Sequence, residues 1–418
     1  MSTLELGVHV DLLGETIEVG TAYLTRNRGS VSTTFSYLPS YLAHPKSYPI
    51  DTAFDLVTGS QHVDRLAGAF GDTAPDRWGR SLITKRDNES ARLEGRRART
   101  LDDVDFFLGV SDVTRQGALR FRRPASQTLN SPEFESAELT VPKLLTLPAL
   151  LRAADEASAG GALAAIATLL DGGTGSLGGA RPKAAVRLED GSLALAKFPH
   201  PEDQWDVMAW EATSHDLARR AGIRVPEHRL STADDRHVLI VRRFDRDSTG
   251  HRLGYLSAMS VLQRRDGEQG DYTELAEALV DLTVTPTAQL HALFDRVVFS
   301  VAFRNTDDHL RNHGLVRTDR GWQLSPIFDV NPNPSAASGR QTSIAGATDP
   351  EDEAEGLAAL AEYCRLDAAA ARGRVLNITA ATSAWREVAR DNGVSRTEQS
   401  TFAETLDESI AGLRSAFD

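Results

Sequence analysis

The chain has 418 residues, of which 41% are hydrophobic and 25% are charged, and its formal net charge at pH 7 is −13. This composition is ordinary for a soluble globular protein and suffices for two or three compact units. The acidic charge argues against this chain alone wrapping nucleic acid, and no apolar run is long enough to cross a bilayer. Because Cys364 is the only cysteine and no signal sequence is visible, we expect a cytoplasmic protein without an intrachain disulfide.

Residues 1–130 are predicted to form a β-rich N-terminal subdomain. Apolar and polar residues alternate over residues 4–12, as in a half-buried strand. Residues 70–79 have the composition of a turn, and a helix is expected to begin at Arg80. Residues 125–139 are rich in serine, threonine, asparagine and proline, which is typical of a linker.

The next part, residues 145–250, contains a glycine-rich run that matches the pattern G-x-G-x-x-G at residues 173–178. A helix is expected before it, over residues 147–170, and two strands after it, joined by Asp190-Gly191, a strong hairpin signal. In a dinucleotide-binding fold the loop would open a helix instead. The hairpin therefore favours a phosphate-binding loop of the kinase type, with a plain surface loop as the alternative.

The last part, residues 251–418, is predicted to be helical. Apolar residues from Leu290 to Val301 recur at helical spacing and mark a core-facing stripe. Further helices are expected over residues 353–365, 367–376 and 396–416.

The most informative pattern follows that apolar stripe. Asp307 is followed by Asn312 five positions later, and by Asp329 after a predicted hairpin. Protein kinases use this order of residues: the first Asp accepts the proton of the attacking hydroxyl, and the Asn and second Asp hold Mg²⁺ on the nucleotide phosphates. The spacing to Asn312 favours Asp307 as the base, although the neighbouring Asp308 could share the role.

Two more residues stand where a kinase requires them. Lys197 ends the second strand after the glycine-rich run, the position of the lysine that binds the α- and β-phosphates. Glu211, on the helix expected next, is placed to be its ion-pair partner. Each residue alone would be an ordinary surface residue, but the whole set in kinase order indicates a kinase.

The chain resembles the HipA family, the kinase toxins of bacterial toxin–antitoxin modules. The resemblance covers nearly the whole chain and rests mainly on the segments 176–183, 243–246, 305–314 and 324–329, with 70–79 and 111–121 in the N-terminal part. It implies an α+β, protein-kinase-like two-lobed fold with a β-rich N-terminal subdomain and an all-helical C-terminal lobe. It also implies the cofactors ATP and Mg²⁺.

By position, the resemblance assigns roles beyond those of the acidic residues. Arg242 and Phe244 would lie at the hinge beside adenine, and His309 would lie near the nucleotide. Lys183, at the end of the glycine-rich loop, matches a lysine of the family motif. Ser176 matches the serine that family members autophosphorylate, which silences ATP binding.

The function implied is a serine/threonine protein kinase toxin, neutralised by a HipB-like helix-turn-helix antitoxin that also mediates contact with operator DNA. Its protein substrate would be an aminoacyl-tRNA synthetase, with glutamyl-tRNA synthetase the obvious candidate, and no membrane is involved. Two other functions stay open. One is a non-toxic co-repressor, to which the basic residues 92–100 and 117–123 would contribute. The other is a small-molecule kinase on the same fold.

Overall fold

The structure is a computed structural model, and it describes residues 2–27, 30–124, 141, 146–159, 163–171, 181–335 and 337–418. By their contacts the residues form two compact units: unit 1 is Met1–Pro201 with Arg242–Leu256, and unit 2 is Glu202–Val241 with Ser257–Asp418. Residues 202–241, grouped by the sequence with the glycine-rich segment, therefore make most of their contacts within unit 2. The domain boundaries 1–130, 145–250 and 251–418 remain predictions.

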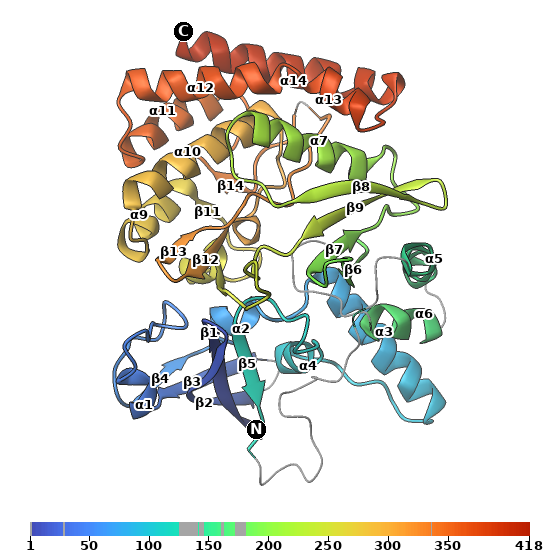
Figure 1. Cartoon of the computed structure of the whole chain (residues 1–418), viewed down its shortest axis with the longest axis vertical. Coiled ribbons are helices and arrows are strands. Elements are labelled where there is room, and N and C mark those ends of the chain that lie inside the picture. Colours follow the sequence, from blue (N-terminus) through green and yellow to red (C-terminus); the bar gives the residue numbers. More distant parts are fainter. Residues whose placement is uncertain are drawn as a thin grey trace. The chain divides into compact units, whose positions relative to one another are not determined.

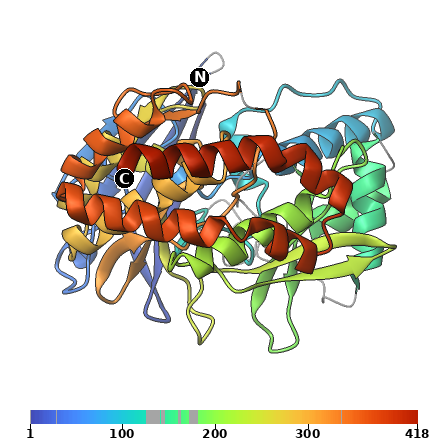
Figure 2. The ribbon, with the colours of Figure 1, turned by 90° about the horizontal axis from the view of Figure 1, so that it is seen from above.

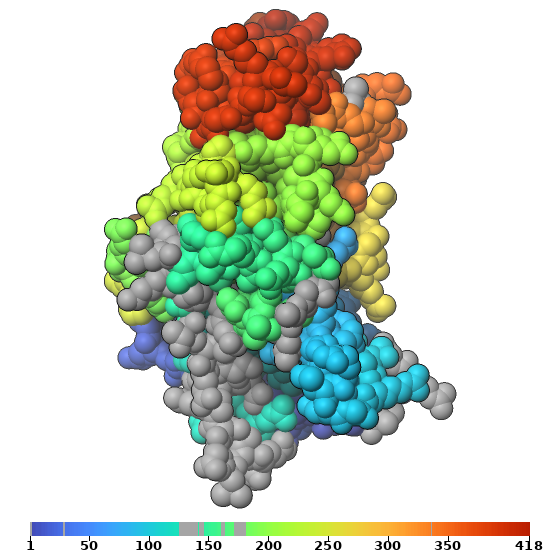
Figure 3. All heavy atoms as spheres, turned by 90° about the vertical axis from the view of Figure 1, so that its right-hand side faces the viewer, coloured from blue at the N-terminus to red at the C-terminus, as the bar shows by residue number. Residues whose placement is uncertain are grey.

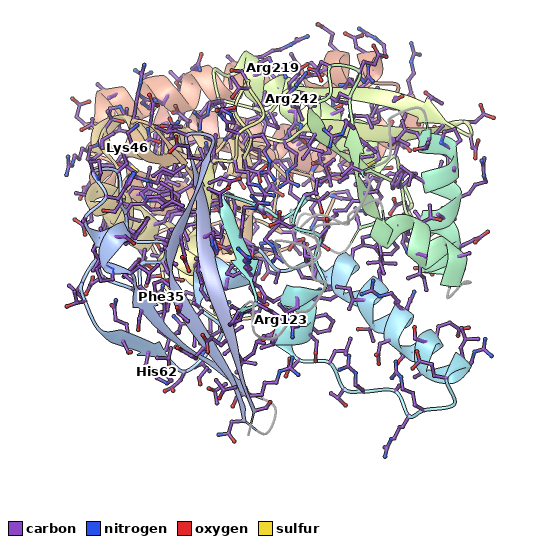
Figure 4. All side chains as sticks on the ribbon, turned by 60° about the horizontal axis from the view of Figure 1, so that its bottom comes forward. Phe35, Lys46, His62, Arg123, Arg219 and Arg242 are labelled. Atoms are coloured by element: carbon purple, nitrogen blue, oxygen red, sulfur yellow. The ribbon has the colours of Figure 1, made fainter. Side chains whose placement is uncertain are left out.

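Unit 1 starts with an antiparallel sheet of strand order β4-β3-β2-β1-β5 (Figure 1). Its strands are β1 (Ser2–Leu12), β2 (Glu15–Asn27), β3 (Ser30–Tyr37), β4 (Ser60–Val63) and β5 (Leu119–Arg122). In β1 the side chains of Leu6, Val8 and Val10 are buried while their neighbours are less so, which confirms the predicted half-buried strand. Phe35, labelled in Figure 4, packs on the same buried face against Phe54.

The helices of unit 1 are α1 (Pro39–Leu42), α2 (Gly68–Gly71), α3 (Arg77–Leu93), α4 (Asp103–Leu108), α5 (Leu147–Ser158) and α6 (Leu163–Asp171). Helix α3 begins three residues before the expected start, because the Asp76 carboxylate caps it by accepting a hydrogen bond from Gly79 N at 2.8 Å. The single helix expected over 147–170 is two helices, α5 and α6. The sequence between them contains Gly160-Gly161, which disfavours a continuous helix.

A hairpin of β6 (Lys183–Arg187) and β7 (Leu193–Lys197) confirms the two strands predicted after the glycine-rich run. Gly191 has φ +83° in its turn, a conformation that favours glycine. The glycine-rich run itself, residues 172–180, lies outside the described residues. The chain re-enters unit 1 at residues 242–256 and reaches β10 (Gly254–Ser257).

Unit 2 is mostly helical, with helices α7 (Val207–Arg220), α8 (Ala258–Val261), α9 (Tyr272–Leu282), α10 (Pro286–Ala302), α11 (Glu353–Tyr363), α12 (Ala368–Thr382), α13 (Trp385–Asp391) and α14 (Arg396–Phe417). Helix α10 buries Leu290, Leu293, Phe294, Val297 and Val301, as the apolar stripe predicted. Figure 2 shows α12 and α14 side by side, and the helices at the C-terminal end of the chain appear as a closely packed red mass of spheres in Figure 3.

The expectation of an all-helical C-terminal part is wrong in one respect. Residues 251–418 also contain the strands β11 (Gly270–Asp271), β12 (Gly314–Thr318), β13 (Gly321–Leu324) and β14 (Thr342–Ser343), of which β12 and β13 form the hairpin expected before Asp329. Unit 2 further contains β8 (His228–Ala233) and β9 (Arg236–Arg242), which precede that part of the chain. In these elements β8 pairs with β9, β12 with β13 and β11 with β14. Among the described residues, no helix is long and apolar enough to span a membrane.

Candidate active site

The predicted catalytic segment follows the buried helix α10 directly. Arg304, just after the helix, has φ +52°, so the chain changes direction sharply there. Asn305 N still donates to Ser300 O at 2.8 Å, which ties the start of the loop to the last turn of α10. A short 3₁₀ helix, Leu310–Asn312, completes the segment. The rigid helix thereby fixes the position of the loop that carries Asp307.

The hairpin of β12 and β13 returns the chain toward this loop before Asp329. Its register runs from Leu315↔Leu324 to Thr318↔Gly321, and Ser325 N donates to Gly314 O at 2.7 Å, so the two ends of the hairpin meet. Asp329 follows with φ +56°, a left-handed conformation that aspartate tolerates better than most residues. The hairpin predicted between the two acidic positions is confirmed.

The chain beyond Asp329 is hydrogen-bonded to the loop before Asp307. Asn333 N donates to Arg304 O at 2.9 Å, and Asn333 Nδ2 donates to Thr306 Oγ1 at 2.8 Å. Two segments separated by more than twenty residues in sequence are therefore fixed next to each other within unit 2. The sequence motif did not indicate the role of Asn333, although this asparagine follows Asp329 closely.

Asp307 and Asp308 are neighbours in sequence but occupy opposite environments. The side chain of Asp307 is exposed, whereas that of Asp308 is 6% exposed. Asp308 Oδ2 accepts hydrogen bonds from Tyr272 Oη at 2.5 Å and Ser300 Oγ at 2.8 Å, and its Oδ1 lies 2.9 Å from His313 Nε2. A carboxylate with these partners is held in place, and only Asp307 faces solvent where an acceptor could approach.

The charge on Asp308 is stabilised by its surroundings. Burial alone would raise the pKa of this carboxyl, but the charge and hydrogen bond of His313, together with Arg340, outweigh burial and hold the pKa well below its usual value. Burial and the Asp308 charge raise the pKa of Tyr272 well above 10, so its hydroxyl stays a donor. Asp308 is therefore an anionic anchor beneath the loop.

Asn312 provides the clearest signal for a metal or other electrophile. Its Nδ2 donates to Asp307 O at 3.2 Å, which fixes the orientation of the amide and directs Oδ1 the other way. Asn312 Oδ1 is buried and has no hydrogen-bond partner among the described residues. A buried acceptor left without a donor costs free energy, and a hard cation would satisfy it.

This donor set fits Mg²⁺ better than a metal that prefers nitrogen or sulfur. Mg²⁺ is bound in proteins by one or two carboxylates, with water and substrate phosphates completing the shell. An amide oxygen from Asn312 and a carboxylate from Asp329 are ligands of this kind. No cluster of three or more His, Cys, Asp or Glu side chains suited to a metal occurs among the described residues, so a metal held by protein ligands alone is not indicated there.

The other predicted site residues of unit 2 lie at defined positions. His309 is half-buried at the start of the 3₁₀ helix, and its backbone oxygen accepts from Asn312 N at 2.8 Å. Glu211 lies in the middle of α7 and is 1% exposed. A buried side chain does not fit the alternative that Glu211 lies on a solvated helix face. An ionised carboxylate is seldom buried without a function or a partner.

In unit 1, Lys183 and Lys197 face each other directly across β6 and β7. Both are buried, at 1% and 6% exposed, and opposed like charges on a sheet repel each other. Asp76 neutralises one of them, since its Oδ2 lies 2.5 Å from Lys183 Nζ, and Trp78 Nε1 donates to Lys183 O at 3.3 Å. The motif 70–79 therefore contributes the counter-ion of Lys183, which the sequence did not predict.

Arg242 contacts the turn of the β6–β7 hairpin. Its guanidinium donates to Ser192 Oγ at 2.5 Å and to Asp190 Oδ2 at 2.8 Å, and it is labelled in Figure 4. Phe244 is half-buried, with its ring centroid 6.3 Å from that of Tyr255. These side-chain contacts are compatible with a hinge whose backbone groups face a ligand. Ser176 lies outside the described residues, so its surroundings are not defined.

The Arg-Phe-Asp-Arg run at 243–246 forms a buried ionic cluster. Asp245 accepts from Arg243 at 2.5 Å and from Arg246 at 2.8 Å, and Gly117 N donates to it at 2.8 Å. Arg243 Nη1 also donates to Thr114 O at 2.9 Å. Burial would raise the pKa of Asp245, but the arginine charges lower it well below its usual value. The run therefore joins residues 242–256 to the segment 111–121 within unit 1.

The basic stretch 92–100 is largely neutralised by its own neighbours. Arg92 pairs with Glu89 at 2.5 Å and Arg96 pairs with Glu94 at 2.6 Å. Arg99 lies 3.5 Å from Asp87. In the stretch 117–123, Arg120 pairs with the buried Asp112 at 2.8 Å. Arginines engaged in this way offer a weak surface for phosphate contacts, which argues against direct DNA binding by these stretches.

Comparisons with known proteins relate the chain to one family and to several candidate kinases. Residues 175–391 match the family described as the HipA-like C-terminal domain. The candidate kinase Y4mE of Sinorhizobium fredii is 26% identical in an alignment over 242 residues, and the match covers 50% of this chain and 55% of that protein. A candidate kinase of Haemophilus influenzae is 26% identical in an alignment over 186 residues, and the match covers 38% of this chain and 54% of that protein. The chain thus spans about half the length of the curated relatives it matches.

Among solved structures, a chain of the Shewanella oneidensis MR-1 toxin–antitoxin complex of HipA, HipB and operator DNA has a TM-score of 0.65. It is 14% identical, and the match covers 98% of this chain and 99% of the other. At this identity the likeness shows a shared fold. It supports the mixture of helices and strands expected of the predicted α+β fold, whereas the two-lobed, kinase-like organisation remains a prediction.

Proposed function

The chain belongs to the family of HipA-like C-terminal domains, as its sequence motifs indicated, and from this premise we propose that it is an ATP- and Mg²⁺-dependent serine/threonine protein kinase of the toxin type. One observation carries the proposal. The exposed carboxylate of Asp307 follows a buried helix, and Asn312, hydrogen-bonded to the backbone of Asp307, presents a buried amide oxygen that has no partner in the described part of the chain. A base and a metal ligand fixed to each other are what phosphoryl transfer requires.

In the proposed reaction Asp307 accepts the proton of an attacking serine or threonine hydroxyl. The hydroxyl oxygen forms a bond to the γ-phosphorus of ATP, the bond from that phosphorus to the bridging oxygen breaks, and ADP leaves with the electron pair. The proton stays on Asp307 until solvent removes it. Because the neighbouring Asp308 is occupied by three hydrogen-bonding side chains, it cannot serve as this acceptor.

Asn312 and Asp329 are the residues that would hold Mg²⁺. When bound, the ion would neutralise the charge that develops on the phosphate oxygens. The chain's own contribution is to fix these two ligands: the amide of Asn312 is oriented by Asp307 O, and Asp329 follows a closed hairpin.

The remaining site residues have proposed roles in binding ATP. Lys197 would contact the α- and β-phosphates with Glu211 as its ion-pair partner, and its burial in β7 supports a role other than solvation. Arg242 and Phe244 would present backbone groups to adenine, and His309 would lie near the nucleotide. For Lys183 we propose a phosphate contact that is tempered by Asp76, because the carboxylate at 2.5 Å already neutralises its charge.

The biological setting is proposed from the family. The substrate would be a protein of the aminoacyl-tRNA synthetase class, and a HipB-like antitoxin would neutralise the kinase and contact operator DNA. Autophosphorylation of Ser176 would switch the kinase off, since a phosphate dianion in the glycine-rich loop would compete with ATP for the same backbone donors.

The deciding experiment is mass spectrometry of the purified protein before and after incubation with Mg-ATP, beside an Asp307→Asn variant. The proposal expects new phosphate on the wild type, at Ser176, and none on the variant. Phosphate on a purified aminoacyl-tRNA synthetase, again absent with the variant, would identify the target class. If the protein is folded and neither protein nor metabolite acceptors gain phosphate, the kinase proposal fails and a co-repressor role takes its place.

A further inference from the structure

The segment after Asp329 is fastened to the catalytic loop at several points. Besides the contacts of Asn333, Gln341 N donates to Thr306 O at 3.2 Å, and Arg304 Nη2 donates to Ser338 O at 3.2 Å. The segment after Asp329, residues 330–335 and 337–348, is therefore hydrogen-bonded to the loop that carries Asp307, even though much of its surface is exposed. In a kinase this is the place of the activation segment, which runs from the second metal-binding acid toward the substrate site.

One charged side chain of this segment points inward. Arg340 is 1% exposed at its side chain, and its backbone N donates to Thr348 O at 2.9 Å. Its Nη2 donates to Ser300 Oγ at 2.8 Å and lies 3.5 Å from Asp308 Oδ2. Its Nη1 lies 3.0 Å from Glu353 Oε1. The guanidinium thus joins the segment to α10, to α11 and to the acid beside Asp307.

The other charged members of this network are paired as well. The second oxygen of Glu353 pairs with Arg304 at 3.2 Å, so two arginines share one buried glutamate. Burial would lower the pKa of Arg340, but the acidic groups around it, including Glu353 and Asp308, raise it, and the arginine stays charged. All of these ionic side chains are at most 6% exposed. A network with this burial is little weakened by salt.

In many kinases the activation segment becomes ordered only after phosphorylation, when an arginine of the catalytic loop pairs with the new phosphate. Here the signs are reversed: the arginine comes from the segment, and the carboxylate of Asp308 comes from the catalytic loop. The pair forms from the chain's own charges. No phosphate is needed to complete it.

We propose that Arg340 is a positioning residue for phosphoryl transfer, which holds the segment after Asp329 against the catalytic loop through Asp308 and Glu353, so that the kinase is active without phosphorylation of that segment. This inference rests on the proposed kinase function and deepens it. Arg340 touches neither ATP nor the acceptor. It acts on Asp307 through the neighbouring Asp308, and on the acceptor site through the backbone around Gln341.

The planar fork of arginine is required for this role. Its two terminal nitrogens reach Ser300 and Asp308 on one side and Glu353 on the other, which the single ammonium of lysine cannot do in one geometry. Arg340→Lys therefore keeps the charge and loses one side of the clamp. Arg340→Met removes the charge and keeps most of the volume. Arg386, which pairs with Asp407 at 2.5 Å on the surface, provides a matched control as Arg386→Lys.

The first measurement is hydrogen–deuterium exchange of the full-length protein without nucleotide, so that it does not depend on kinase activity. In both Arg340 variants the amides of residues 338–348 should exchange at least ten times faster than in the wild type. In the same variants the exchange of helices α12 and α14 should match that of the wild type. In the Arg386→Lys variant the exchange of residues 338–348 should match that of the wild type. Unchanged exchange in residues 338–348 would overturn the proposed clamp whether or not the protein is a kinase.

The second measurement is the initial rate of phosphoryl transfer to the acceptor found in the mass-spectrometry experiment. Misplacement of catalytic groups by about 1 Å can cost about 100-fold in rate, and we expect a loss of this size in kcat for Arg340→Met. The KM for ATP should stay within twofold. Added guanidinium ion should restore part of the rate in a smaller variant, Arg340→Ala, but not in Asp307→Asn. A rise in the KM for ATP with an unchanged kcat would overturn the proposal. So would a failure of guanidinium to restore the rate of Arg340→Ala, since either result would indicate a structural role.

Phosphatase treatment separates this inference from the proposed function. Wild-type protein freed of phosphate should transfer phosphate at least as fast as the untreated protein, since only phosphate on Ser176 is proposed to slow it, and active protein should contain no phosphate within residues 330–348. A rate that falls when phosphate is removed from that segment would overturn the inference while leaving the kinase intact. A protein with no transfer under any condition, but with the expected exchange pattern, would refute the kinase and retain the clamp as a structural element.

Discussion

The two adjacent aspartates should respond in opposite ways to the same substitution. Asp307→Asn removes an exposed carboxylate, and surface substitutions usually change the free energy of unfolding by at most about 0.5 kcal/mol. It should nevertheless abolish measurable phosphoryl transfer, because the acceptor of the hydroxyl proton is lost. Asp308→Asn should instead act first on stability, by lowering the free energy of unfolding of unit 2.

The size of the second effect follows from the contacts of Asp308. The carboxylate accepts from Tyr272 and Ser300, and it is paired with His313 and Arg340, all within a buried network. Removing one partner of a buried ion pair typically costs about 3 to 5 kcal/mol. Since Arg340 keeps Glu353 as a partner, we expect the lower end of this range. For a unit of this size about 3 kcal/mol corresponds to a fall in Tm of roughly 6 to 12 °C.

The assay is thermal and urea unfolding followed by tryptophan fluorescence. Trp205, Trp210, Trp322 and Trp385 belong to unit 2, whereas Trp78 belongs to unit 1, so the signal reports mainly on unit 2. The Asp307→Asn variant serves as the matched control at the next position. An Asp308→Asn variant with the wild-type Tm, or an Asp307→Asn variant with undiminished transfer, would refute this assignment of roles.

Three further outcomes are expected. Because the folded-state pKa of Asp308 lies below its unfolded value of about 4, its contribution to stability is present above that pH and is lost on acidification, so the Tm difference between wild type and Asp308→Asn should shrink from pH 7 to pH 3. Asp76→Asn should destabilise unit 1 by about 3 kcal/mol through the loss of the Lys183 pair, and Asp76→Ala by about 1 kcal/mol more, because it also removes the cap of α3. The Cys364 thiol is buried, which raises its pKa to about 12, so at pH 8 it should react with a disulfide reagent only at the rate of unfolding.

Each of these outcomes has a control. For the pH dependence, a Tm difference between the wild type and Asp308→Asn that stays constant from pH 7 to pH 3 would contradict the paired state of Asp308. For Asp76, equal stabilities of the Asn and Ala variants would contradict a capping role, and a wild-type Tm in both would contradict the ion pair. For Cys364, urea should accelerate the reaction in parallel with the loss of fluorescence, and rapid labelling of the folded protein would show that the thiol is accessible.

Much of the local structure could be predicted from sequence pattern. The alternation in residues 4–12, the Asp190-Gly191 turn and the apolar stripe of α10 each identified an element that the structure contains. These succeeded because burial imposes a period of two on strands and about 3.6 on helices. The break between α5 and α6 and the two-residue strands β11 and β14 were missed, since short elements depend on their partners rather than on their own periodicity.

For the candidate site, the sequence by itself determined which residues are proposed for phosphoryl transfer, because the spacing of Asp307, Asn312 and Asp329 along the chain is the signal. It did not determine which of two adjacent aspartates is buried, that Asn312 Oδ1 would have no donor among the described residues, or that Asp76 would neutralise Lys183. Those facts arise from partners that lie far away in sequence, such as Tyr272 and Arg340 for Asp308. Burial and electrostatic environment are properties of the packed chain, so only the tertiary structure could decide them.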